Sequence, residues 1–144
     1  MLRSIIISPD VELALRLETA ATKTGEVSVN RVWNSYPTAI DLVRSLRAHA
    51  PEVLFLSFES LEKVQEIVRC VEQQAGGLQI IAIHRTCDAK ILCETMRLGV
   101  REFLSDPFER ALLIDAISHV KVLLERKASD QCCAERVFVV GTGY

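Results

Sequence analysis

Strand-like apolar runs alternate with helix-like segments along most of this 144-residue chain, and this alternation constrains its fold more than any other feature. The runs that we interpret as strands are 4–8, 27–33, 53–57, 78–84 and 101–104. The segments with apolar residues at helical spacing are 9–24, 38–49, 61–75, 88–98 and 107–127. Because short connections join each strand to the next helix, the strands should be parallel and covered by helices on both faces. We therefore expect an α/β fold, a flavodoxin-like (βα)5 three-layer sandwich with strand order 2-1-3-4-5.

Two of the expected helices follow strong start signals. Ser8 and Pro9 have the residue types of an N-cap and a first-turn proline. Asp106, Pro107 and Glu109 have the spacing of a capping box around a first-turn proline. These patterns predict that the first and last helices begin directly at these residues.

The composition excludes several classes of function. The chain is 49% apolar and 25% charged, which is typical of a soluble globular domain. A net charge of −2 with mixed signs gives no reason to expect a nucleic-acid partner, and no apolar run approaches the ~20 residues of a membrane span. The five cysteines form no C-x-x-C pair, and the three histidines lie in unrelated segments. We expect free thiols in a reducing cytoplasm, with no metal and no cofactor.

Two segments resemble the receiver domain of two-component response regulators, and the resemblance extends over about residues 3–127. "GVREFLSDPFE" is similar to the receiver pattern Gly-Ala-x-x-(Tyr/Phe)-Leu-x-Lys-Pro-Phe, and "PEVLFLSF" to its Pro-Asp-(apolar)4-Asp segment. The resemblance implies the fold expected above. It also places Phe103 at the switch aromatic of receivers.

The positions that carry receiver chemistry differ in this chain. Ser57 stands where receivers have the phosphoacceptor aspartate, and Asp106 where they have a lysine. The complete set of altered or neighbouring positions is Ser8, Pro9, Asp10, Ser57, His84 and Asp106. Phosphoryl transfer needs an anionic oxygen nucleophile, a divalent ion held by carboxylates and a cation that stabilises the product. We therefore expect a pseudo-receiver with a degenerate phosphorylation pocket, no catalytic residue and no bound metal.

Ser57, His84 and Asp106 also suggest a rival interpretation, a Ser-His-Asp hydrolase at the ends of three strands. Hydrolases of the α/β type carry their serine in G-x-S-x-G, whereas this chain has "FLSFE". Bulky phenylalanines flank the site and no glycine permits the tight turn. We therefore expect that the chain is not an enzyme and has no small-molecule substrate.

The resemblance implies an interaction surface, because receivers commonly signal and dimerise through helix four, strand five and helix five. Here that surface corresponds to residues 89–127. The exposed contacts expected on it are Glu94, Arg97, Arg101, Glu102 and Asp115. We expect protein partners, including a second copy of the chain in a homodimer.

The end of the chain suggests which kind of larger protein the receiver-like domain belongs to. We divide the sequence into a receiver-like domain at 1–127, a linker at 128–135, and a first strand with a truncated glycine loop at 136–144. This order resembles Tad/Flp pilus-assembly ATPases of the TadZ/CpaE type, in which an atypical receiver precedes a ParA/MinD-like ATPase. The resemblance implies a bacterial cytoplasmic protein recruited to a cell pole or secretion complex, without membrane insertion. The alternative is the receiver of a transcriptional response regulator in a phosphorelay.

Two conformational predictions follow. If the receiver backbone is retained, the Asp106–Pro107 peptide bond is cis. The apolar residues 136–140 should add as a strand to the edge formed by the second or fifth strand, between two chains rather than within one.

Overall fold

One five-stranded parallel sheet forms the centre of the molecule, with the strand order β2-β1-β3-β4-β5. The computed structural model describes the backbone of residues 1–86 and 88–142, and the side chains of 1–86 and 88–126. The elements are β1 (Leu2–Ile7), α1 (Val11–Thr24), β2 (Val27–Trp33), α2 (Ala39–His49), β3 (Val53–Ser57), α3 (Leu61–Gln74), β4 (Gln79–His84), α4 (Ala89–Arg97), β5 (Glu102–Ser105) and α5 (Arg110–Thr142). The predicted fold class and strand order are confirmed.

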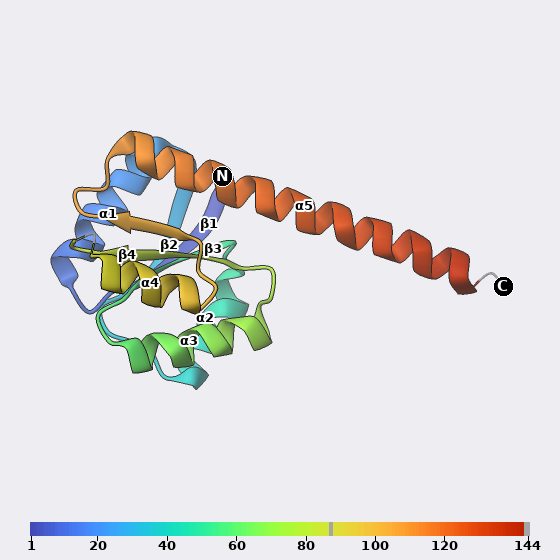
Figure 1. Ribbon diagram of the computed structural model, residues 1–144, viewed down its shortest axis with the longest axis horizontal. Coiled ribbons are helices and arrows are strands. Elements are labelled where there is room, and N and C mark those ends of the chain that lie inside the picture. The colour runs from blue at the N-terminus through green and yellow to red at the C-terminus, as the bar shows by residue number, and fades with distance from the viewer. Residues whose placement is uncertain (87, 143–144) are drawn as a thin grey trace.

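Helices cover both faces of the sheet, as Figure 1 shows. Successive residues of a strand point to opposite faces, so Leu54 and Phe55 of the fully buried β3 belong to two different clusters. Phe55 packs in the cluster that contains Leu17 of α1 and Ile117 of α5. Leu54 packs in the cluster with residues of α2 and α3, among them Leu42. The near-continuous apolar character of β3 follows from this burial on both faces.

The first helix begins later than predicted. Asp10, not Ser8, is the N-cap of α1, and its carboxylate accepts a hydrogen bond from the backbone N of Leu13 at 3.2 Å. Ser8 is buried and its hydroxyl donates to the carbonyl of Asp10 at 3.0 Å. Because β1 ends at Ile7, the chain uses Ser8 and Pro9 to turn before the helix starts.

The last helix also begins later than predicted, so the capping box at Asp106 and Glu109 is wrong. The Asp106–Pro107 bond is cis, as predicted from the receiver resemblance. Phe108 has φ 57°, and its backbone N donates to the carbonyl of Ser105 at 2.9 Å. Residues 106–109 therefore form a turn that delays α5 to Arg110, and the Asp106 carboxylate does not cap it.

Helix α5 continues to Thr142, which contradicts the strand predicted at 136–140. No glycine or proline interrupts the sequence between Pro107 and Gly141, so nothing local stops a helix once it has started. Its last part extends away from the sheet (Figure 1). Within the described residues, no helix is both long and apolar enough to cross a membrane. The division into domains beyond residue 127 stays a prediction.

Candidate functional site

The carboxyl ends of β1, β3, β4 and β5 bring the six positions of the degenerate pocket to one edge of the sheet. Ser57 is the last residue of β3 and His84 the last of β4, while Ser8 follows β1 and Asp106 follows β5. The register places Ser57 opposite Ile83 and His84 opposite Ser105. Side chains that are far apart in sequence therefore meet at the edge where parallel α/β sheets bind their ligands.

The Ser57 side chain is fully buried and is not accessible at the edge of the sheet. Its hydroxyl has no hydrogen-bond partner among the described residues. The Tyr36 hydroxyl donates to the Ser57 carbonyl at 2.5 Å and accepts from the backbone N of Glu59 and Ser60 at 3.1 and 3.3 Å. Burial raises the pKa of Tyr36, which keeps this hydroxyl protonated. Tyr36 thus fixes the turn after β3 next to Ser57, whose hydroxyl contacts no base among the described side chains.

Asp10 is already paired with a cation. The Arg85 Nη2 lies 2.8 Å from Asp10 Oδ1, and Arg85 Nε donates to Oδ2, so the contact is bidentate. The same guanidinium lies 3.5 Å from Glu12 Oε2. The hydrogen bonds from Arg85 hold the pKa of Asp10 at about 2, well below its usual value of 3.8. Sequence reasoning missed Arg85, although its position directly after β4 was a signal that it would reach this edge.

Asp106 has a second arginine. Arg16 of α1 binds Asp106 Oδ2, while Oδ1 is buried and has no hydrogen-bond partner among the described residues. The backbone N of Asp106 donates to the carbonyl of His84 at 3.1 Å. The His84 ring is directed elsewhere, because its Nδ1 accepts from the backbone N of Thr86 at 3.2 Å. The two acids of this edge are thus each bound to a guanidinium from another element.

Comparisons with solved structures agree with the fold. No protein-family model matches the sequence, and no curated protein matches it. The chain is similar to the solved structure of a protein described as related to pilus assembly from Burkholderia pseudomallei K96243. That match has a TM-score of 0.71 and 20% identity, and covers 85% of this chain and 91% of that chain.

Two further solved structures point the same way. The CheY-like protein tadZ from Pseudomonas aeruginosa PAO1 matches with a TM-score of 0.68 and 19% identity, over 83% of this chain and 94% of that chain. A protein described as a pilus assembly protein, cpaE, from Burkholderia thailandensis E264 matches with a TM-score of 0.66 and 21% identity. That match covers 85% of this chain and 99% of that chain. Signal receiver domains also match. The chain folds as a receiver-like domain.

The receiver fold implies a divalent cation at this edge, and the residues present do not fit one. Ser8 and Pro9 stand at the positions of the metal-binding acids, the neighbouring acid is Asp10, and Arg85 occupies both of its carboxylate oxygens. Pro9 offers no side-chain ligand, and the Ser8 hydroxyl is directed to the Asp10 carbonyl. No group of three or more His, Cys, Asp or Glu side chains in the described part of the chain could hold a metal ion. A guanidinium neutralises Asp10 in the receiver-like domain.

The hydrolase interpretation finds no support in the geometry. Catalysis by a triad needs the serine hydroxyl hydrogen-bonded to the histidine, and the histidine to the acid. The Ser57 hydroxyl has no partner among the described residues, His84 bonds to Thr86, and Asp106 binds Arg16. The three residues lie at one edge but are not connected.

The expected interaction residues lie on a surface formed by α4, β5 and α5, which we call the α4–β5–α5 face. Arg97, Arg101 and Asp115 are exposed, whereas Glu94 and Glu102 are half-buried. His119 of α5 joins two of them, because its Nδ1 lies 2.9 Å from Glu102 Oε1 and its Nε2 lies 3.8 Å from Asp115 Oδ1. Glu102 and Asp115 are therefore brought together.

Sequence reasoning missed the apolar part of the α4–β5–α5 face. Leu112 is 56% exposed, and Val122 of α5 and Met96 of α4 are exposed as well. Leu112, Asp115, His119 and Val122 recur at helical spacing and so share one side of α5. Phe103, the switch aromatic, is half-buried and packs against the cluster that contains Leu98.

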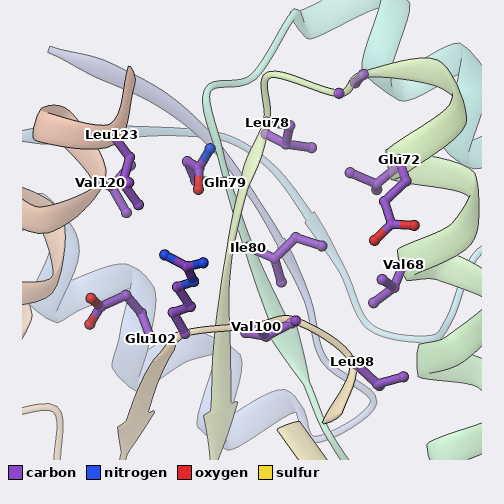
Figure 2. Close-up of a pocket in the computed structure, with 15 residues that line it drawn as sticks. Val68, Glu72, Leu78, Gln79, Ile80, Leu98, Val100, Glu102, Val120 and Leu123 are labelled. Carbon is purple, nitrogen blue, oxygen red and sulfur yellow. The ribbon is translucent and has the colours of Figure 1, made fainter. Parts of the chain in front are cut away.

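A separate cleft of about 330 Å³ lies at the opposite end of the sheet, where β4 begins. Gln79 and Ile80 precede the first β4–β5 pair, Ile81 with Glu102, so β5 does not cover this part of β4. Figure 2 shows Gln79 directed toward Val120 and Leu123 of α5, and Ile80 toward the α3 side. None of the six pocket residues lines this cleft, so it is distinct from the degenerate pocket.

Proposed function

We propose that the receiver-like domain is a pseudo-receiver, a non-catalytic module that acts by binding proteins and is not phosphorylated. One observation carries this proposal: both acids of the pocket are paired with arginines of the same chain, and the serine at the acceptor position is buried. Asp10 is bound by Arg85, Asp106 by Arg16, and Ser57 is fully buried.

The chemistry of phosphoryl transfer explains why this arrangement matters. The transferred group is anionic and needs a nucleophile, a metal ion and a free cation that stabilises charge. Here the nucleophile position holds a hydroxyl that no base activates, and the nearby guanidinium groups already bind carboxylates. A phosphorelay receiver, the alternative function, requires the chemistry that this pocket lacks.

Intact-mass spectrometry after incubation with acetyl phosphate and Mg²⁺ tests the proposal. We expect no increase in mass, while a phosphorylatable receiver treated in the same mixture gains one phosphoryl group. A Mg²⁺-dependent gain on this chain that is lost in Ser57→Ala would contradict the pseudo-receiver function directly.

We propose further that the α4–β5–α5 face makes the protein contacts, including a homodimer. Its exposed apolar residues Met96, Leu112 and Val122 beside charged residues have the composition of an interface. The similarity to structures described as pilus assembly proteins supports a role in pilus assembly, where we propose that the domain regulates a ParA/MinD-like ATPase. On this proposal the protein is cytoplasmic and is recruited to a cell pole or secretion complex.

Analytical ultracentrifugation tests the homodimer. Met96→Glu with Leu112→Glu should shift the protein toward monomer, because carboxylates replace apolar side chains in the buried contact. Ile40→Glu is the matched control, since Ile40 is equally exposed but lies on α2. If the control dissociates the protein as strongly, or if the double variant sediments unchanged, this face is not the dimer contact.

A further inference from the structure

The cleft where β4 begins, which we call the β4 cleft, lies at an uncovered part of the sheet edge. Pairing between β4 and β5 starts with Ile81 and Glu102, so residues 78–80 have no neighbouring strand on that side within the described chain. Gly99 contributes to this gap, because its φ of 83° turns the chain after α4 and before β5 begins. None of the degenerate-pocket positions lines the cleft, so a site here is additional to the function proposed above.

The walls of the β4 cleft are aliphatic on both faces of the sheet. Figure 2 shows Val68 and Leu78 on the α3 side of β4, and Val120 and Leu123 on the α5 side. Val100, from the segment between α4 and β5, also lines the cleft. Its volume of about 330 Å³ is at the lower end of the range of about 300–1,000 Å³ that is typical of small-molecule sites. The β4 cleft therefore suits a compact ligand with an aliphatic part.

The uncovered edge of β4 carries a backbone donor without a partner. The backbone N of Gln79 donates to the carbonyl of Glu52 at 3.1 Å, so Gln79 directs its backbone polar groups toward the β3 side. Successive residues of a strand alternate in this direction, so the Ile80 N–H points to the opposite side, where β5 has not begun. Within the described residues, no acceptor binds the Ile80 N–H. A backbone N–H at the wall of a cleft needs an acceptor, which a bound ligand can supply.

Two unpaired charges of opposite sign line the β4 cleft. Arg101 and Glu72 are exposed and form no ion pair within the described part of the chain. The third charged residue of the lining, Glu102, is already bound through its Oε1 by His119. Figure 2 shows Glu72 on the α3 side of β4 and Glu102 on the α5 side. The cleft thus combines one unpaired cation and one unpaired carboxylate with aliphatic walls.

We propose that the β4 cleft binds a free aliphatic α-amino acid. The carboxylate of this ligand would accept hydrogen bonds from the Ile80 N–H and the Arg101 guanidinium, and its ammonium group would contact Glu72. Its side chain would pack against the aliphatic walls. A zwitterion matches both unpaired charges, whereas a simple carboxylic acid leaves Glu72 unpaired and a simple amine leaves Arg101 unpaired. The inference goes beyond the proposed function, because it adds a small ligand to a module proposed to bind proteins.

Titration of the full chain with L-leucine, followed by ¹H–¹⁵N NMR, tests the proposal. We expect saturable amide shifts concentrated at residues 71–80 and 98–102. Three analogues each remove one feature of the ligand: isocaproate lacks the ammonium group, isoamylamine lacks the carboxylate, and glycine lacks the aliphatic side chain. Each analogue should bind about tenfold more weakly or less, because it loses a charge-assisted hydrogen bond or the apolar contact.

Substitutions in the lining supply the matched variants. Arg101→Gln and Glu72→Gln should each weaken leucine binding about tenfold, since each removes one charged partner of the zwitterion. Arg69→Gln and Glu66→Gln make the same changes at exposed positions of α3 outside the lining and should leave binding unchanged. Ala75→Phe should abolish binding without a change in charge, because the larger side chain fills the cleft. The NMR spectrum of each variant reports whether its fold is retained.

Several outcomes would overturn the proposal. Equal binding of isocaproate or isoamylamine would show that the cleft does not recognise a zwitterion, and the absence of saturable shifts at millimolar leucine would show that it is not an amino-acid site. Because Arg101 also belongs to the α4–β5–α5 face, the titration is repeated with Met96→Glu and Leu112→Glu combined, neither of which lines the cleft. Unchanged leucine binding in this variant supports the site independently of the homodimer. Loss of binding there would assign the shifts to the dimer contact instead.

Discussion

Arg85 shows how one residue can change what a receiver-like pocket does. A single guanidinium binds both oxygens of Asp10, while the same carboxylate caps α1 through the backbone N of Leu13. This contact connects the start of α1 to the segment after β4. The Asp10 carboxylate, which could otherwise contribute to metal binding, therefore holds α1 and the segment after β4 together.

The Asp10–Arg85 contact predicts a specific pH dependence. Because the pKa of Asp10 is lowered from 3.8 to about 2 in the folded protein, its stabilising contribution is present above pH 3.8 and is lost as the pH falls toward 2. Arg85→Gln should remove it. The variant should therefore be less stable than the natural chain at pH 7, and the difference should shrink between pH 4 and pH 2.

Urea unfolding at several pH values measures this difference. Arg69→Gln is a suitable control, because Arg69 is an exposed cation on α3 and forms no ion pair within the described residues. If Arg85→Gln and Arg69→Gln have the same stability at pH 7, the contact with Asp10 contributes nothing measurable.

At the scale of elements, α5 has two different sides. Leu113, Ile117 and Val120 are buried against the sheet, whereas the adjacent Leu112 is 56% exposed on the α4–β5–α5 face. The same helix therefore stabilises the fold with one side and presents an apolar surface with the other. Helical spacing separates these roles between neighbouring residues.

Alanine substitutions at these two neighbours should separate stability from association. Leu113→Ala should cost about 2–5 kcal/mol of unfolding free energy, because it opens a cavity in the core. Leu112→Ala should change stability by less than about 0.5 kcal/mol, as expected for a surface position, but weaken the proposed homodimer. Denaturant unfolding and sedimentation measure the two effects, and a stability loss at Leu112 as large as that at Leu113 would show that both sides of α5 are core.

The whole molecule combines a covered sheet with a helix that extends beyond it (Figure 1). Val120 of α5 belongs to the buried apolar cluster, and the partly buried Leu124 packs against it. Among the described side chains, the core of the receiver-like domain thus ends on α5 with Val120 and Leu124.

Removal of residues 128–144 should leave this core folded. We expect the shortened chain to keep a cooperative thermal transition, with a midpoint within about 4 °C of the full chain, which corresponds to roughly 1 kcal/mol. Circular dichroism during heating measures this. A broad transition, or a much larger drop, would show that the folded unit needs residues beyond 127.

The sequence alone determined the order of elements, the parallel sheet and the edge at which Ser8, Ser57, His84 and Asp106 meet. These follow from local patterns, because apolar periodicity and chain connectivity restrict how βα units can pack. The turn at residues 106–109 and the extent of α5 were predicted wrongly, because capping and apolar-run patterns also fit other backbone paths. Only the tertiary structure decided which charges pair: Arg85 with Asp10 across 75 positions, and Arg16 with Asp106 across 90. Such contacts depend on where side chains end in space, and no spacing along the chain encodes that.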